Sequence, residues 1–159
     1  WFNAQLVADR WIAEGFAGLY AAQAGAAIGV EVTPIAMTPD ALAEAVPLNA
    51  WVVGGSQDLF GHAAAMALAN AIRELAGDEA LRQVWRNAAA GIGAYQPEPP
   101  SGAGSDAGPE DGSPPLDWRS LLALLEAGPA GSTGSFEKLW RQWVVRPADA
   151  ALLDVRSGA

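Results

Sequence analysis

Apolar residues recur every three to four positions along most of this chain, which is the spacing of helices that bury one face. The pattern is clearest over residues 136–143, where Phe136, Leu139, Trp140 and Trp143 stand at positions i, i+3, i+4 and i+7. Proline and glycine residues separate the periodic stretches, as expected at helix ends. The pattern predicts helices over residues 9–27, 38–46, 57–76, 78–90, 117–126 and 136–145.

The predicted helix 57–76 is apolar on nearly all sides, so we expect it to be buried by its neighbours. The next predicted helix places Leu81, Val84, Trp85 and Ala88 on one face. The apolar residues at 152–155 are compatible with a short strand or with packing on the last helix. We therefore predict an all-α fold, a helical bundle in which residues 1–159 form a single domain.

One stretch departs from this pattern. Residues 96–115, QPEPPSGAGSDAGPEDGSPP, are rich in Pro, Gly, Ser and acidic side chains. Such a segment buries too little apolar surface to offset the conformational entropy lost on folding. We expect a disordered surface loop within one domain, because the helices on both sides look like parts of the same bundle.

The composition of the chain argues against several classes of function. The net charge of −9 argues against nucleic-acid binding and against an anionic membrane surface, since both need Lys and Arg. No apolar run is long enough for a transmembrane helix. The absence of cysteine excludes disulfides and thiolate metal sites. Arg outnumbers Lys eight to one, which is typical of GC-rich bacterial genomes, while the compartment stays open between cytoplasmic, extracytoplasmic and membrane-anchored full-length proteins.

The N-terminal stretch WFNAQLVADRWIAEGFAGLY places a carboxylate, Glu14, among aromatic and small residues of a predicted helix. A charge in such surroundings needs a partner. Small residues such as Gly15 and Gly18 would allow a second helix to approach this one closely. The stretch begins without a helix start signal, so we expect that the chain continues upstream.

This stretch resembles the segment that follows H-E-x-x-H in gluzincin zinc peptidases, the membrane-alanyl-aminopeptidase-like superfamily. Trp1-Phe2 matches the Trp-Phe pair of that family, and Trp11–Ala17, WIAEGFA, matches its W-x-x-E-G-[FL]-A segment. Ala13 stands where the family usually has Asn, and the gap between the two elements is shorter. The resemblance implies a divergent branch in which Glu14 is the third zinc ligand.

A catalytic zinc usually takes three protein ligands, and this chain contains a single histidine, His62. The resemblance therefore implies that both zinc histidines and the general-base glutamate lie upstream of residue 1. Without the flanking motif, Glu14 would be interpreted as a glutamate on a helix surface, which is the common position of this residue type.

Two further residues have candidate roles. The resemblance implies that Asp9 could orient a zinc-bound histidine from the second shell, whereas its position at a helix start also fits an N-cap. Gluzincins need a hydrogen-bond donor opposite the zinc, usually Tyr, and the matching region 58–62 has only His62 as a donor. His62 is thus a candidate for oxyanion stabilisation, or a histidine at a helix start without a catalytic role.

These observations predict part of a zinc-dependent metallopeptidase that hydrolyses peptide substrates once joined to its N-terminal portion, and that is inactive as the isolated chain. The alternative is a non-catalytic helical interaction module, either a degenerate peptidase or an unrelated bundle. Peptide preference, exopeptidase or endopeptidase action and oligomeric state do not follow from the sequence.

Overall fold

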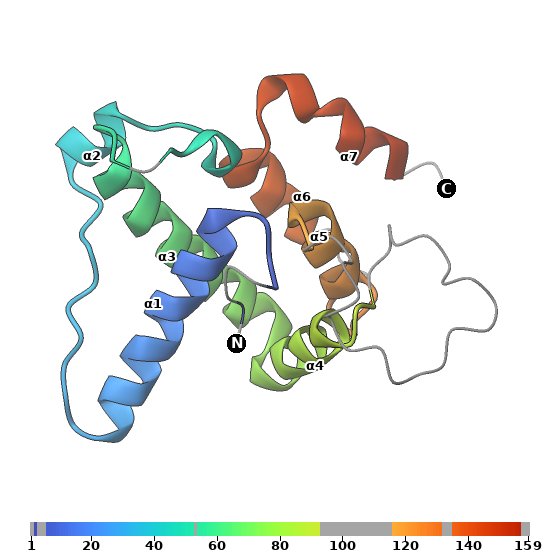
Figure 1. Ribbon diagram of the computed structural model, residues 1–159, viewed down its shortest axis with the longest axis horizontal. Helices are drawn as coiled ribbons and strands as arrows, with labels where there is room; N and C mark the ends of the chain where they lie inside the picture. The colour runs from blue at the N-terminus through green and yellow to red at the C-terminus, as the bar shows by residue number, and fades with distance from the viewer. Residues whose placement is uncertain (1, 3–5, 53, 93–115, 132–134, 157–159) are drawn as a thin grey trace.

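The computed structural model describes residues 2, 6–52, 54–92, 116–131 and 135–156, which form the all-α structure predicted (Figure 1). Outside the helices, one isolated parallel bridge joins Val7 to Leu116. The helices are α1 (Arg10–Ala27), α2 (Pro39–Ala43), α3 (Asp58–Ala76), α4 (Asp78–Ala89), α5 (Trp118–Glu126), α6 (Ser135–Leu139) and α7 (Ala151–Arg156), with the shorter turns η1 (Leu48–Ala50), η4 (Trp140–Val144) and η5 (Pro147–Asp149).

Helix α3 is the central element of the bundle. It packs against α1, α4 and α6, and also against the short α2 and η1. Helices α1 and α3 cross in Figure 1. Neighbouring residues advance together along both helices, from Arg10 beside Asp58 to Gly18 beside Met66, so the two helices run in the same general direction. The chain connects them through an extended strap, residues 30–37, at the left edge of Figure 1.

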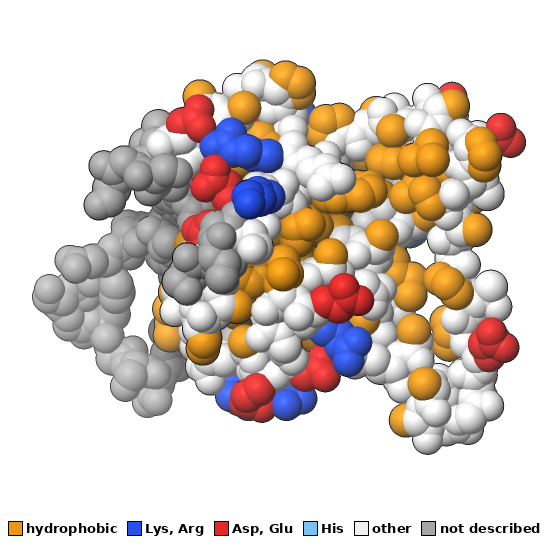
Figure 2. All heavy atoms as spheres, turned by 180° about the vertical axis from the view of Figure 1, so that it is seen from behind, with side chains coloured by type: hydrophobic (Ala, Val, Ile, Leu, Met, Phe, Trp, Pro, Cys, Tyr) orange, Lys and Arg blue, Asp and Glu red, His pale blue; other side chains and the backbone are white. Residues whose placement is uncertain are grey.

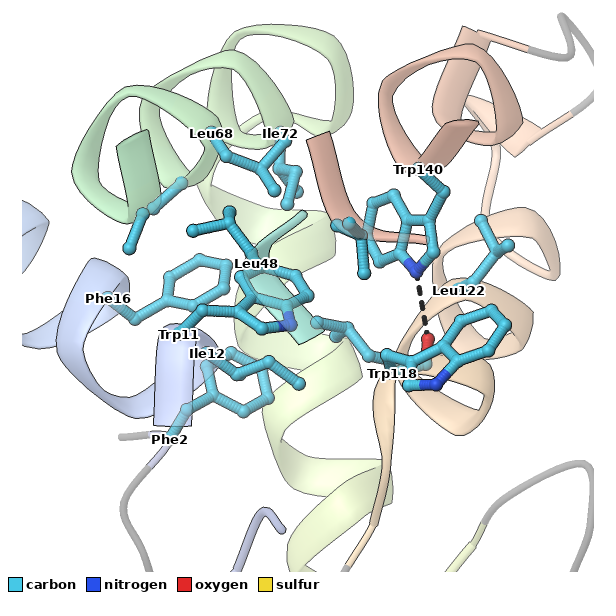
Figure 3. Packing of buried hydrophobic residues seen from close by; sticks show 14 of the residues in the cluster. Phe2, Trp11, Ile12, Phe16, Leu48, Leu68, Ile72, Trp118, Leu122 and Trp140 are labelled. Carbon is cyan, nitrogen blue, oxygen red and sulfur yellow. Dashed lines mark hydrogen bonds between the residues drawn. The ribbon is translucent and has the colours of Figure 1, made fainter. Parts of the chain in front are cut away.

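Buried aromatic side chains join α1 to the C-terminal part of the chain (Figure 3). The rings of Trp11 and Trp140 meet edge to face with centroids 5.6 Å apart. Phe2 packs on Phe16 with centroids 4.7 Å apart. Ile72 of α3 belongs to the same cluster and is fully buried. Burial of this apolar surface is the main driving force for the fold.

The helix predicted over residues 136–145 forms as two segments, because α6 continues into the π-helical turn η4. Within that turn, the Val145 N–H donates to the Trp140 carbonyl five residues earlier. The predicted core face is confirmed, with Phe136 and Trp140 fully buried. Trp140 Nε1–H also donates to the Trp118 carbonyl of α5 at 3.0 Å, which fixes the indole in the core (Figure 3).

Three local expectations need correction. The predicted helix 38–46 is shorter, since α2 ends at Ala43 after Thr38 caps it through a 3.1 Å bond from the Ala41 N–H. Of the two alternatives left open for the C-terminal tail, the strand is wrong, because the tail forms the helix α7 and buries Leu153. Trp85 is 37% exposed, although the other three residues of its predicted face are buried. Trp85 therefore lies at the exposed border of that face.

Helix α3 was predicted to be buried on nearly all sides, but it is buried only on the side that faces its neighbours. Phe60, Leu68 and Ile72 are buried, whereas Leu59 is 61% exposed. The loop expected at residues 96–115 lies outside the described residues. Among the described helices, none combines the length and apolar character needed to cross a bilayer.

Candidate functional site

The W-x-x-E-G-F-A segment occupies the first two turns of α1, with its large apolar side chains in the core and Glu14 at the surface. Trp11, Gly15 and Phe16 are buried, whereas the Glu14 side chain is 41% exposed. Trp11 Nε1–H donates to Asn49 Oδ1 at 3.1 Å, which ties this turn to η1. The apolar residues of the segment therefore anchor the helix, and Glu14 is left available for polar contacts.

Close approach of α1 and α3 brings Glu14 to His62. A Cβ at Gly15 would overlap the Ala65 backbone carbonyl, so glycine is what allows the backbones to meet there. Gly18 lies next to Met66 in the same crossing. As a result, Glu14 Oε2 lies 3.9 Å from His62 Nδ1. The two residues singled out separately in the sequence share one site.

Arg10 is a member of this site that the sequence analysis did not identify. Its Nε lies 3.5 Å from Glu14 Oε1, and its Nη1 lies 3.7 Å from Asp58 Oδ1. The guanidinium also stacks over the Trp51 ring, 4.3 Å from its centroid, in cation–π geometry. Nη1 is buried and makes no hydrogen bond within the described part of the chain. The spacing of Arg10 and Glu14, four residues apart on one helix, was the available local signal.

Asp58 organises the opposite side of the site. Its carboxylate accepts hydrogen bonds from Trp51 Nε1–H at 2.9 Å and from the Gly54 N–H at 2.7 Å. These two bonds lower the pKa of Asp58, because they favour the ionised carboxylate. The Trp51 ring meets the His62 ring edge to face, with centroids 4.8 Å apart. We refer to Arg10, Glu14, Trp51, Asp58 and His62 as the crossing cluster.

Asp9 lies away from the crossing cluster and holds a different part of the chain. It precedes α1 at the N-cap position, but its side chain makes no capping bond to that helix. Its carboxylate instead accepts the Trp118 N–H at 2.6 Å, at the start of α5. Burial raises the pKa of Asp9, although the bond from Trp118 opposes that shift. Asp9 thus occupies the predicted N-cap position, but the capping bond expected for α1 does not form and its side chain bonds to a neighbouring helix instead.

The donor set for a metal is incomplete among the described residues. They contain no group of three His, Cys, Asp or Glu side chains arranged to hold a metal ion. Glu14 and His62 supply two donors, one fewer than a catalytic zinc usually takes. Glu14 itself suits a ligand role, since it is accessible and carried by a rigid helix. Any zinc site that uses it needs ligands from other residues.

Two other features do not add catalytic groups. Tyr20 packs beside Phe16 with ring centroids 6.1 Å apart, and burial raises the pKa of its hydroxyl, which supports the packing role. Tyr95 lies outside the described residues. A groove of about 210 Å³ between α4 and α5 is lined by small, apolar and amide side chains without a titratable group. The crossing cluster is therefore the best candidate for a functional site.

Comparison with protein-family models, with curated proteins and with solved structures finds no match to this chain.

Proposed function

We propose that this chain is part of a zinc-dependent metallopeptidase of the gluzincin type, with Glu14 as the third zinc ligand. The observation that supports the proposal best is the placement of the W-x-x-E-G-F-A side chains, some in the core and one at the surface. Its large apolar residues are buried and hold the helix, while the half-exposed Glu14 lies 3.9 Å from a histidine. A carboxylate held in this way has the rigidity that a metal ligand needs.

The proposal requires two histidines from polypeptide outside these 159 residues, since the chain has one histidine. Bound zinc would lower the pKa of a water molecule and polarise a peptide carbonyl. Within this chain, Glu14 would supply one carboxylate oxygen. His62 would stand beside it as a hydrogen-bond donor toward the substrate oxygen, in agreement with its position across from Glu14.

Arg10 would adjust when zinc binds. Its Nε lies 3.5 Å from Glu14 Oε1, and a divalent cation bound to Glu14 would compete with the guanidinium for that carboxylate. Asp58, 3.7 Å from Arg10, offers the guanidinium a second partner. The crossing cluster can thus release Glu14 without leaving Arg10 unpaired.

The decisive measurement is zinc content after dialysis, made on the protein extended upstream of Trp1. We expect one zinc per chain in the wild type and a loss or strong weakening in Glu14→Gln, because the amide is a poor ligand. Glu74→Gln on the exposed side of α3 is the matched control and should keep its zinc. Equal zinc in Glu14→Gln and wild type, or none in either, would refute the proposal. The 159-residue chain alone should show no zinc-dependent peptidase activity.

A second candidate function, a non-catalytic helical interaction module, is favoured by one observation. Arg10 pairs with both Glu14 and Asp58, so the charges of these two carboxylates are balanced in part by a residue of the same chain. In that case the cluster stabilises the helix crossing, and Glu14→Gln would lower the free energy of unfolding without changing metal content. The same two variants therefore distinguish the two functions.

A further inference from the structure

A second surface stands out at the end of the molecule formed by the strap, α2 and the start of α3. Most of the large apolar side chains exposed in the described part of the chain fall between residues 28 and 59. Six of them are at least 46% exposed: Ile28, Val30, Ile35, Leu42, Val52 and Leu59. Exposed apolar groups gathered in one region indicate an interaction site. We call this region the strap face.

The strap face carries charge of one sign. The sequence contains no Lys or Arg between Arg10 and Arg73. Glu31 and Asp40 are exposed and make no ion pair with any described residue. Figure 2 shows the same feature, because its right-hand part, where the strap and α2 lie, displays orange and red side chains and no blue. A partner for this face should therefore be positively charged.

The backbone of the strap is also available for pairing. It runs extended (Figure 1). At its start the Val30 N–H donates to the Gly25 carbonyl of α1, and at its end the Thr38 N–H donates to the Ala36 carbonyl of the strap itself. Among the described residues, the N–H groups of 31–33 and 35–37 have no hydrogen-bond partner, and Pro34 between them has no N–H to offer. An extended segment with Val, Thr and Ile and an unpaired backbone is a template for strand addition.

We propose that the strap face binds a basic, extended polypeptide segment of another protein, which pairs with the strap backbone and places alternate apolar side chains against its exposed Val and Ile residues. The charge of the face excludes an acidic partner, and the unpaired backbone favours a strand over a helix. This inference does not depend on zinc binding or on the role of Glu14.

The test is fluorescence anisotropy with the full chain and a labelled peptide, KVTVKVTVK. Two comparison peptides carry Glu in place of Lys, or N-methyl groups on alternate residues that block backbone pairing. We expect saturable binding of the basic peptide that weakens with salt, and little binding of either comparison peptide. Equal binding of the acidic or N-methylated peptide would overturn the proposal.

Matched variants locate the binding site. Glu31→Lys should weaken binding about tenfold at low salt, whereas Glu74→Lys makes the same change in net charge near the C-terminal end of α3, outside the strap face, and should have little effect. Ile35→Ser should weaken it about fivefold, and Leu75→Ser, at a residue of similar exposure outside the face, should not. Equal effects of test and control variants would contradict the proposal.

Two other occupants are distinguished by the same protein samples. Concentration-dependent dimerisation in sedimentation, lost in Ile35→Ser, would assign the face to a second copy of this chain. Binding to phosphatidylcholine vesicles without affinity for the peptide would assign it to a lipid surface. Either result would overturn the proposal.

Discussion

At the scale of single residues, Asp58 holds together one side of the crossing cluster. Its carboxylate receives hydrogen bonds from Trp51 and Gly54 and lies 3.7 Å from the Arg10 guanidinium. The pKa of Asp58 is lowered from 3.8 by these contacts, so the native state favours the ionised form more than the unfolded state does. The resulting stability is present above about pH 4 and is lost as the pH falls through the lower native pKa.

We therefore expect Asp58→Asn to lower the free energy of unfolding near neutral pH, because the neutral amide replaces an ionised acceptor. The difference from the wild type should shrink as the pH falls below about 4, where the wild-type carboxyl also becomes neutral. Urea unfolding over a series of pH values measures both effects. Asp40→Asn, at an exposed carboxylate of α2, should leave the curve almost unchanged. A constant difference from neutral to acidic pH would contradict this account.

Contacts between single residues also show which features of the site could not be predicted from the sequence. Glu14 could be singled out because aromatic and small residues surround it in the sequence. Its approach to His62, and the stacking of Arg10 on Trp51, depend on how two helices cross. These pairs are separated by more than forty positions, and no local rule fixes their geometry. The Arg10–Glu14 pair could have been predicted from the sequence, because both residues lie four positions apart in one helix.

At the scale of elements, the crossing of α1 and α3 depends on glycine at one position more than at the other. A Cβ at Gly15 would overlap the Ala65 carbonyl, which is backbone and cannot move aside cheaply. A Cβ at Gly18 would lie 3.4 Å from the Met66 sulfur, at the end of a flexible side chain. The two glycines therefore respond differently to the same substitution.

We expect Gly15→Ala to destabilise the fold by about 1–3 kcal/mol, the range typical of overpacking a core contact. Gly18→Ala should be neutral or stabilising by up to about 1 kcal/mol, because alanine has the higher helix propensity. Chemical denaturation followed by circular dichroism measures both. If the two variants lose equal stability, the close approach at Ala65 is not what requires glycine.

The elements themselves were largely predictable because their apolar residues repeat with helical period. The bounds of α1, α3, α4 and α5 lie within one residue of the predictions. The exceptions are short or depend on context. A six-residue tail carries too little periodicity to separate helix from strand, so α7 was not predicted. The exposure of Trp85 depends on how wide a face the neighbouring helices cover.

At the scale of the whole molecule, the two halves of the chain meet at the start of α1 and the start of α5. Val7 and Leu116 form a parallel bridge, with the Ala8 N–H donating to the Leu116 carbonyl at 2.8 Å. Asp9 adds a bond from the Trp118 N–H, across 109 positions of sequence. This junction joins the segment that carries Glu14 to the buried tryptophans of the C-terminal half.

Removing the Asp9 carboxylate should weaken the fold as a whole, since it leaves the buried Trp118 N–H without an acceptor. We expect Asp9→Ala to cost about 1–3 kcal/mol at neutral pH. Asp9→Asn keeps an acceptor oxygen and removes the charge whose burial raises the pKa of Asp9, so it should be close to neutral. Urea unfolding followed by circular dichroism and tryptophan fluorescence measures both variants.

The two probes also report whether the junction couples the halves. Circular dichroism detects all helices, whereas fluorescence reports on the surroundings of the tryptophans, among them Trp11 of α1 and Trp118 and Trp140 of the C-terminal half. If the core unites both halves, Asp9→Ala shifts the two transitions together to a lower midpoint. Transitions that separate in Asp9→Ala but coincide in the wild type would mean that this contact, more than the Trp11–Trp140 packing at 5.6 Å, holds the halves in one cooperative unit. Unchanged stability in Asp9→Ala would show that the Trp118 N–H finds another acceptor and that the core alone joins the halves.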